Sequence, residues 1–434
     1  MKSLLTRSLH IENPKQCASA LRPRRRLHSR SAFESPRGTV GEARCKSAHW
    51  GMRWPEAMRL QDLHDIGVHA SKRREHGMFL HEELQVRFAH CLQELWSLPH
   101  GLSEQHEIPN IIRSYQDMLS TLEASPVPRA FASDTKFLEI LNSVMTEEQS
   151  SLPLLTSSLM GIRDDLGCAY DIVQPEIDAA VERFLQLRAG HRFLAKHYIE
   201  PALGNGEQLS AYQPGCELAH VARGAADRSM ALCMSWFGEA PEIIVHDERP
   251  DILCMASPAH VNYILTEIFK NSLRAVVEYR SDGCQVVGAP LPSICCSILH
   301  SEGEARLKIS DLGGGIERKR MQDIWKYSFS TSSSSRQLVS AHLPAMSGHG
   351  MGLPLSRLYA RHFGGDLEIF SKEGVGSDVF FRLSSRGTER ETLPKQVERG
   401  RISMTPLSLP SLPQKTAWRF DLLPGLMAQG NLAN

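Results

Sequence analysis

The stretch TEIFKNSLRAVVE at residues 266–278 places polar side chains along one stripe of an otherwise apolar predicted helix. Glu267, Asn271 and Arg274 are spaced i, i+4 and i+7, so Asn271 and Arg274 lie within about 40° of Glu267 around a helix over 258–280. Burying a carboxylate, an amide and a guanidinium together is unfavourable unless they have partners. The stripe therefore marks a candidate site, with an intrahelical ion pair on a solvated face as the alternative.

A second segment, ISDLGGGI at 309–316, ends a predicted strand at Asp311 and continues into three consecutive glycines. Glycine permits positive φ and the close approach of a ligand to the backbone. An aspartate at a strand end can accept a hydrogen bond from an exocyclic amine. An ordinary glycine turn is the alternative explanation.

A third segment, GHGMGLPLSRLYARHFGG at 348–365, has alternating glycines (Gly348, Gly350 and Gly352) that lead into a predicted helix. Backbone N–H groups at a helix N-terminus suit a phosphate chain. The pattern lacks the GK[ST] of a Walker loop, and no strand precedes it as in a Rossmann fingerprint. We therefore expect a phosphate-binding loop of another type.

Two further segments flank this loop. Ser330 and Thr331 begin a serine-rich stretch before it, which predicts a mobile lid or a solvated loop. The hairpin predicted after it joins GDLEIFS to SDVFFRL through KEGVG.

Residues 56–200 have the periodicity of long amphipathic helices. FLHEELQVRFAHCLQEL at 79–95 places apolar residues at three- and four-residue spacings. The same pattern returns over 108–122, 134–166 and 177–199. Long helices joined by short loops predict an antiparallel bundle. After a turn-rich stretch at 204–215, strands alternate with long helices, which predicts an α+β or α/β sandwich.

The charges are unevenly distributed along the chain. Lysine and arginine total 49, as do aspartate and glutamate, yet residues 1–50 hold eleven basic and three acidic side chains. The remaining 38 basic and 46 acidic residues give a net charge of −8, which argues against a general nucleic-acid binder. The basic, serine-rich leader predicts a mitochondrial transit peptide, with a disordered basic tail as the alternative.

Composition argues against other classes. No stretch approaches the roughly 18 apolar residues of a membrane span. The ten cysteines are scattered and form no CxxC pair, so neither a disulfide framework nor a zinc site is indicated.

The order of the chemical segments is more specific than any one of them. ExxxN, DxGxG, GxGxG and a terminal hairpin over about 120 residues resemble the N, G1 and G2 boxes of the GHKL ATPase fold shared by gyrase B, Hsp90, histidine kinases and MutL. The sequences EIFKNSLRAVVE, ISDLGGGI and GLPLSRLYARHFGGDLEI resemble segments of the mitochondrial 2-oxoacid dehydrogenase kinases, namely pyruvate dehydrogenase kinase and branched-chain 2-oxoacid dehydrogenase kinase. The resemblance spans about residues 56–384, and SRLYARHFGGDL is nearer the pyruvate dehydrogenase member.

This resemblance implies an α+β protein in which an N-terminal four-helix bundle precedes a GHKL-type ATP-binding sandwich. The expected regions are a transit peptide or disordered leader at 1–50, a lipoyl-docking bundle at 51–205, an ATP-binding kinase domain at 215–385 and a C-terminal tail at 386–434. The implied activity is transfer of the ATP γ-phosphoryl group to serine of the E1α subunit of a 2-oxoacid dehydrogenase complex, most closely the pyruvate dehydrogenase complex, which inactivates it.

The resemblance also implies partners and cofactors. It predicts a homodimer in the mitochondrial matrix that docks on the E2 lipoyl domain, contacts E1α, and uses ATP and Mg²⁺. Family members also use K⁺ near the nucleotide, which no side-chain pattern here reveals.

Carried onto this chain, the family's roles make Glu267 the general base for the substrate hydroxyl and Asn271 the Mg²⁺ ligand. Asp311 corresponds to the residue that binds the adenine amino group. The other implied nucleotide-binding positions are Ile268, Phe269, Lys270, Ser272, Leu273 and Arg274 on the helix, Gly313 and Gly315 beside the adenine, Ser330 and Thr331 in the lid, and Gly348, His349, Gly350, Met351, Gly352 and Leu353 around the phosphates.

The chain departs from the family in three places. Alignment on Pro153 puts Glu148 where the family has a histidine that pairs with the catalytic glutamate. A carboxylate beside Glu267 would raise the pKa of Glu267, or a different residue is its partner. The lid sequence SSSSRQLVSAHLPAMS is unusual, and Trp418 with Asp421 is the nearest match to the family's C-terminal DW pair.

Three alternatives stay open from sequence. The first is that the substrate is the branched-chain complex. The second is that the chain is a related protein-histidine kinase, and the third is that it is an ATP-binding scaffold without catalysis. The bundle lacks a phosphoacceptor histidine in an H-E/D-x-R/K context, which disfavours the histidine kinase, whereas Glu148 keeps the scaffold alternative open.

Overall fold

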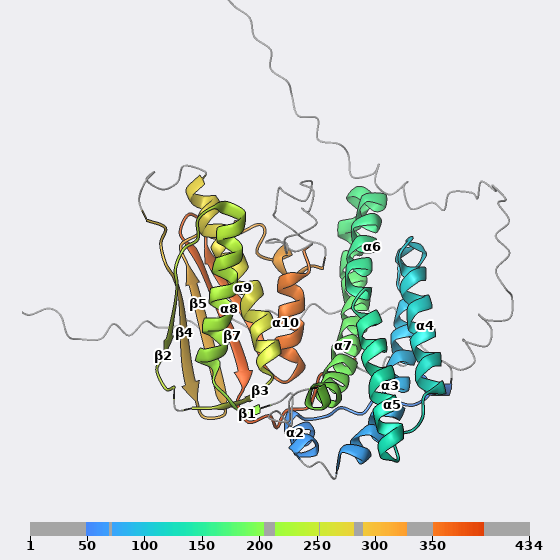
Figure 1. Cartoon of the computed structure of the whole chain (residues 1–434). Coiled ribbons are helices and arrows are strands. Elements are labelled where there is room, and N and C mark those ends of the chain that lie inside the picture. The colour runs from blue at the N-terminus through green and yellow to red at the C-terminus, as the bar shows by residue number, and fades with distance from the viewer. Residues whose placement is uncertain are drawn as a thin grey trace, which may run out of the picture. The chain divides into compact units, whose positions relative to one another are not determined.

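The computed structural model describes residues 49–68, 72–203, 213–250, 252–281, 290–327 and 350–394. Its N-terminal part is helical, as the periodicity predicts (Figure 1). The helices are α2 (Leu60–Val68), α3 (Arg73–Trp96), α4 (Ile108–Ala124), α5 (Phe131–Glu148), α6 (Ser151–Leu166) and α7 (Tyr170–Leu203), with the short 3₁₀ helices η3 (Leu102–Glu104) and η4 (Gly167–Ala169) between them.

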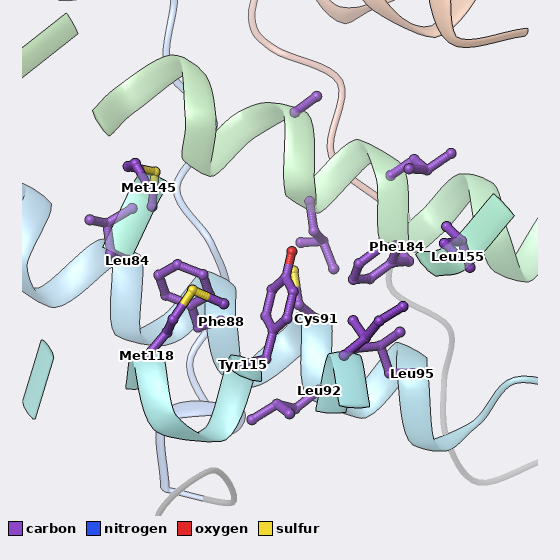
Figure 2. Packing of buried hydrophobic residues seen from close by; sticks show 14 of the residues in the cluster. Leu84, Phe88, Cys91, Leu92, Leu95, Tyr115, Met118, Met145, Leu155 and Phe184 are labelled. Atoms are coloured by element: carbon purple, nitrogen blue, oxygen red, sulfur yellow. The ribbon is translucent and has the colours of Figure 1, made fainter. Parts of the chain in front are cut away.

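The apolar faces of helices α3 to α7 share one core, part of which Figure 2 shows. Phe88 of α3 lies edge-to-face against Tyr115 of α4, with ring centroids 5.4 Å apart. Tyr115 makes the same kind of contact with Phe184 of α7 at 5.7 Å. Offset and edge-to-face pairs are the favoured aromatic geometry, so these rings link three helices at the centre of the core.

The predicted helical stretch at 134–166 is two helices rather than one. Helix α5 ends at Glu148 and α6 begins at Ser151. Pro153 explains the break, because its ring would clash with the carbonyl of Gln149 in a continuous helix and it has no N–H to donate. In the first turn of α6 that missing donor has no cost.

The C-terminal part is an α+β sandwich, as predicted. Its helices are α8 (Leu218–Phe237), α9 (Pro258–Tyr279) and α10 (Gly352–His362), with the short helix η6 (Asp323–Trp325). Its strands are β1 (Gln213–Cys216), β2 (Ile243–Asp247), β3 (Cys254–Ala256), β4 (Ile294–Ser301), β5 (Glu304–Asp311), β6 (Asp366–Lys372) and β7 (Gly376–Ser384).

Five of these strands form one sheet in the order β2-β4-β5-β7-β6. Strand β2 runs parallel to β4, and the other pairs are antiparallel. Figure 1 shows α8, α9 and α10 on one face of this sheet. Ala305, Leu307 and Ile309 of β5 are buried in the core beneath these helices, whereas Arg306 between them is exposed. The alternation is the period of two expected for a strand with one covered face.

Strands β1 and β3 form a separate two-stranded sheet in which Cys216 lies opposite Cys254. The sequence predicts a turn-rich boundary up to residue 215 and no strand here. A strand of four residues with the sequence QPGC has no alternation to detect, and its proline and glycine are typical of turns.

The residues after β7 return to the helical part. The N–H of Gln61 donates to the carbonyl of Gly387, and that of Glu391 donates to Met58. The N–H of Thr392 donates to the carbonyl of His362 at the end of α10. The first residues of the stretch that the sequence assigns to a tail therefore connect α10 to the segment before α2.

No helix in the described part of the chain is both long enough and apolar enough to span a bilayer.

Candidate active site

Helix α9 presents the predicted polar stripe at the edge of a pocket. Ile264 and Ile268 are buried in the core against the sheet, which fixes the rotation of the helix. Glu267, Asn271 and Arg274 lie on the side that lines the pocket. The alternative of a fully solvated ion-pair face does not apply to this stripe.

The Glu267 carboxylate lies between a cation and the start of α10. Its Oε1 accepts a hydrogen bond from Nζ of Lys270 at 2.7 Å. A β-carbon at Gly352 would come within 2.5 Å of its Oε2. Glycine at 352 thus allows the carboxylate to reach the N-terminus of α10, where backbone N–H groups and the helix dipole favour negative charge.

Asp311 is held rigidly at the end of β5. Its Oδ2 accepts a hydrogen bond from the Ser272 hydroxyl at 2.9 Å. Its Oδ1 accepts from the backbone N–H groups of Gly313 at 3.0 Å and Ser377 at 3.3 Å. Burial raises the pKa of Asp311, although these hydrogen bonds favour the charged form. The carboxylate is therefore fixed in orientation at the pocket wall.

Backbone conformation and close packing require glycine at the positions after Asp311. Gly314 and Gly315 have φ values of +76° and +71°, which strain any other residue. A β-carbon at Gly313 would lie 2.6 Å from the β-carbon of Ala275 on α9. The loop can therefore pass directly against α9 and close that side of the pocket.

These segments enclose a pocket of about 410 Å³. This volume lies within the range of ordinary ligand sites, roughly 300–1,000 Å³. The structure brings the following predicted residues to its wall: Glu267, Ile268, Asn271, Ser272, Arg274, Asp311, Gly313, Gly315, Gly350, Gly352 and Leu353.

Other predicted residues lie elsewhere. Phe269 and Leu273 are fully buried in the core of the sandwich. Lys270 acts on the pocket through Glu267, and Met351 is buried in the core of the helical part. Ser330, Thr331, Gly348, His349, Trp418 and Asp421 lie outside the described residues.

The pocket also contains residues that the sequence analysis missed. Ile369 of β6 with Ser377 and Val379 of β7 line it, although the hairpin looks like an ordinary turn in sequence. Ile324 of η6 lines it as well. Glu278 continues the α9 stripe one turn beyond Arg274, so its spacing alone would have identified it.

Metal ligands are sparse at this site. The described residues contain no group of three or more His, Cys, Asp or Glu side chains arranged to hold a metal ion. Mg²⁺ at phosphate-transfer sites commonly takes only one or two protein oxygens and completes its shell with phosphates and water. The amide oxygen of Asn271 in the pocket fits that donor set.

Glu148 has cationic partners within the helical part. Its Oε1 lies 2.6 Å from Nε of Arg188, and its Oε2 contacts Arg192. Burial raises the pKa of Glu148, but the charge of Arg188, the proximity of His191 at 3.6 Å and the charge of Arg192 outweigh burial and lower the pKa to about 2. Among the described residues, Glu267 forms an ion pair with Lys270.

Comparison with known proteins agrees with this geometry. The family model described as mitochondrial branched-chain alpha-ketoacid dehydrogenase kinase matches residues 57–208, and that of the histidine kinase-, DNA gyrase B- and HSP90-like ATPase matches residues 256–387. The chain is 30% identical over 357 residues to the mitochondrial [pyruvate dehydrogenase (acetyl-transferring)] kinase of Arabidopsis thaliana, covering 80% of this chain and 94% of that kinase.

Animal kinases are nearly as similar. The Drosophila melanogaster kinase of the same name is 29% identical, covering 78% of this chain and 84% of that kinase. The mitochondrial [pyruvate dehydrogenase (acetyl-transferring)] kinase isozyme 4 of Homo sapiens is 28% identical, covering 80% of this chain and 85% of that kinase. On the strength of the site and these matches, the chain belongs to the mitochondrial 2-oxoacid dehydrogenase kinase family, alongside the pyruvate dehydrogenase kinases.

Proposed function

We propose that this protein is an ATP-dependent protein-serine kinase that phosphorylates the E1α subunit of the pyruvate dehydrogenase complex and thereby inactivates it. The observation that carries the proposal is that Glu267, Asn271 and Asp311 line one pocket beside the N-terminus of α10. The relatives named as pyruvate dehydrogenase kinases favour pyruvate over the branched-chain complex.

Each of these residues has a role that its surroundings support. Glu267 accepts the proton of the substrate serine hydroxyl, and Lys270 holds its carboxylate in place. Asn271 ligates Mg²⁺, which neutralises charge on the phosphates when bound. Asp311 accepts a hydrogen bond from the adenine amino group, since Ser272, Gly313 and Ser377 already fix its orientation.

The phosphates lie against α10 in this proposal. Gly350, Gly352 and Leu353 line the pocket at the start of that helix. Backbone N–H groups there, together with Arg274, suit a polyphosphate chain. The family's K⁺ would lie near the same nucleotide.

We assign residues 51–205 to docking of the E2 lipoyl domain, 215–385 to ATP binding and catalysis, 1–50 to a mitochondrial leader and 386–434 to a C-terminal extension. The leader composition and the names of the relatives, which call them mitochondrial, support our proposal that the protein is in the mitochondrial matrix.

A homodimer is supported by the face of the sheet opposite α8, α9 and α10, on which side chains of the described strands are exposed. Phe370 of β6 is 61% exposed and packs edge-to-face on Phe380 of β7. Arg306 and Arg382 share that face with Asp378, so it carries both signs of charge and can complement itself about a two-fold axis. Phe370→Glu should give a monomer by sedimentation velocity, and an unchanged dimer would place the interface elsewhere.

The catalytic test uses purified full-length protein with Mg-ATP, E2 lipoyl domain and E1. We expect serine phosphorylation of E1α and loss of complex activity. Glu267→Gln should abolish transfer while nucleotide binding survives, because it removes the base and keeps the shape. Glu248→Gln, an exposed residue at the end of β2, is the matched control and should transfer at the wild-type rate.

The same assay separates the alternatives. A wild-type protein that binds Mg-ATP and never labels E1α is a scaffold, and the kinase proposal is then wrong. Phosphohistidine on the protein itself, labile to acid, would indicate a histidine kinase. Asn271→Ala with unchanged Mg-ATP affinity would contradict the metal role.

A further inference from the structure

Arg87 of α3 and Glu391 form a bidentate ion pair between positions 304 residues apart in sequence. Nη2 of Arg87 lies 2.6 Å from Oε1 of Glu391, and Nη1 lies 2.9 Å from Oε2. Glu83, one turn earlier on α3, accepts a hydrogen bond from Nε of Arg87 at 2.7 Å. All three side chains are buried, Arg87 completely.

The two carboxyl groups of this triad respond differently to Arg87. Burial opposes the charge on Glu391, but the Arg87 guanidinium outweighs it and keeps the pKa of Glu391 well below its ordinary value. Burial raises the pKa of Glu83, against the pull of Arg87. Buried ion pairs are often no more stabilising than apolar residues of similar volume, so stability alone does not account for the triad.

The pair ties the end of α10 to the helical part. Oε2 of Glu391 lies 3.3 Å from Nε2 of His362, the last residue of α10. The next residue, Thr392, donates its N–H to the His362 carbonyl at 2.8 Å. Gly190 of α7 leaves room for the pair, because a β-carbon there would lie 2.3 Å from Nη1 of Arg87 and 2.8 Å from Oε2 of Glu391.

The other end of α10 forms part of the nucleotide pocket. Gly350 and Gly352 line that pocket. Met351 between them is only 6% exposed and belongs to the core of the helical part, as does Leu358 on the next turns of α10. The placement of α10 on the helical part therefore determines where the two glycines lie.

We propose that Glu391, held by Arg87, is a positioning residue that fixes α10 on the helical part and thereby places Gly350 and Gly352 for the nucleotide phosphates. The inference rests on the proposed ATP site. It predicts that removing the triad changes nucleotide affinity even where the fold is retained.

The test is calorimetric titration of the full-length protein with Mg-ATP, beside its thermal unfolding. The triple variant Glu83→Gln/Arg87→Met/Glu391→Leu removes the buried charges and keeps the volume. We expect an unfolding temperature near the wild type and a Kd for Mg-ATP raised about tenfold, since small displacements of binding groups are costly. Glu391→Gln keeps the shape but replaces one of the two acceptors of Arg87 by a donor, so we expect this single variant to raise the Kd as well.

Glu389→Gln is the matched control, an exposed change two residues away that should leave the Kd unchanged. A triple variant that unfolds cooperatively and binds Mg-ATP as the wild type does would overturn the positioning role. If the triple variant does not fold, Gly190→Ala displaces the same pair, and wild-type affinity in that variant overturns the role equally. Wild-type protein that binds no Mg-ATP would overturn the proposed function, and the positioning role with it.

Discussion

Oε1 of Glu148 lies 2.6 Å from Nε of Arg188, and both side chains are buried in the core of the helical part. Tyr115 donates its hydroxyl to the same carboxylate at 3.0 Å, and Ser151 donates at 3.2 Å. The charge of Glu148 is thus compensated by Arg188 of α7, with hydrogen bonds from α4 and α6.

Glu148→Gln should destabilise the protein at neutral pH and progressively less in acid. The folded-state pKa of Glu148 is lowered from 4.5 to about 2. The carboxylate therefore contributes stability above pH 4.5, and the contribution is lost as the pH falls from 4.5 towards 2. A shift of this size corresponds to about 3 kcal/mol at pH 7.

Urea unfolding of wild type and variant at pH 7 and pH 4 measures this difference. The exposed neighbour Glu147→Gln is the control and should change the free energy of unfolding by less than about 0.5 kcal/mol. A Glu148→Gln deficit that is the same at both pH values would contradict the assigned pairing.

A second pH dependence comes from two histidines whose rings lie 5.3 Å apart between α3 and α7. Burial lowers the pKa of His76 to about 3 and that of His197 to about 4. Both are neutral in the folded state, while the unfolded chain binds protons near pH 6.5. Stability is therefore complete above pH 6.5 and falls as the pH drops below it.

His76→Gln should flatten this loss between pH 6.5 and 5, a window that lies above the titration of Glu148. The measurement is the slope of the unfolding free energy against pH for both proteins. Exposed His106→Gln is the control and should keep the wild-type slope. Equal slopes in wild type and His76→Gln would show that His76 does not titrate on unfolding.

The sequence predicts the parts of the site that lie within one element. The spacing of Glu267 and Asn271 follows from helix periodicity alone, and Asp311 follows from a strand that ends in glycines. The class of the fold follows from the change of periodicity after residue 204. These features are local, so a pattern read along the chain contains them.

The parts that could not be predicted depend on distant segments. Ser377 reaches Asp311 only because β7 pairs with β5 in one register. The partner of Glu148 is on α7, and that of Glu391 is on α3. The residues next to a charged side chain in sequence do not indicate which distant residue of opposite charge will contact it in the fold.

Asp311→Asn should weaken Mg-ATP binding by about tenfold, because one bidentate or buried hydrogen-bond partner is worth roughly 1–2 kcal/mol. Ser272→Ala should weaken it less, since the backbone donors Gly313 and Ser377 still orient the carboxylate. Because the pKa of Asp311 is raised, wild-type affinity should also begin to fall at a higher pH than an ordinary aspartate would give. Fluorescence titration with an ATP analogue, repeated over a range of pH for the wild type, measures these affinities. Equal affinity of Asp311→Asn and wild type would contradict the assignment of Asp311 to the adenine site.

Gly352→Ala should impair catalysis without impairing the fold. The added β-carbon would come within 2.5 Å of Oε2 of Glu267, the far end of a flexible side chain. The carboxylate can rotate away at little cost to stability, but it then leaves the position from which, in our proposal, it accepts the serine proton. We expect the rate of E1α phosphorylation to fall about 100-fold, as for other small misplacements of a catalytic group, while the unfolding temperature stays near the wild type.

Gly313→Ala is the instructive contrast. Its β-carbon would meet backbone atoms of Ala275 and Val276 at 2.8 and 2.9 Å, and backbone cannot move aside. That variant should lose thermal stability together with activity, whereas Gly352→Ala should lose activity alone. Wild-type turnover in Gly352→Ala would mean that the proton acceptor is not the carboxylate facing α10, because displacing that carboxylate would then have no effect on transfer.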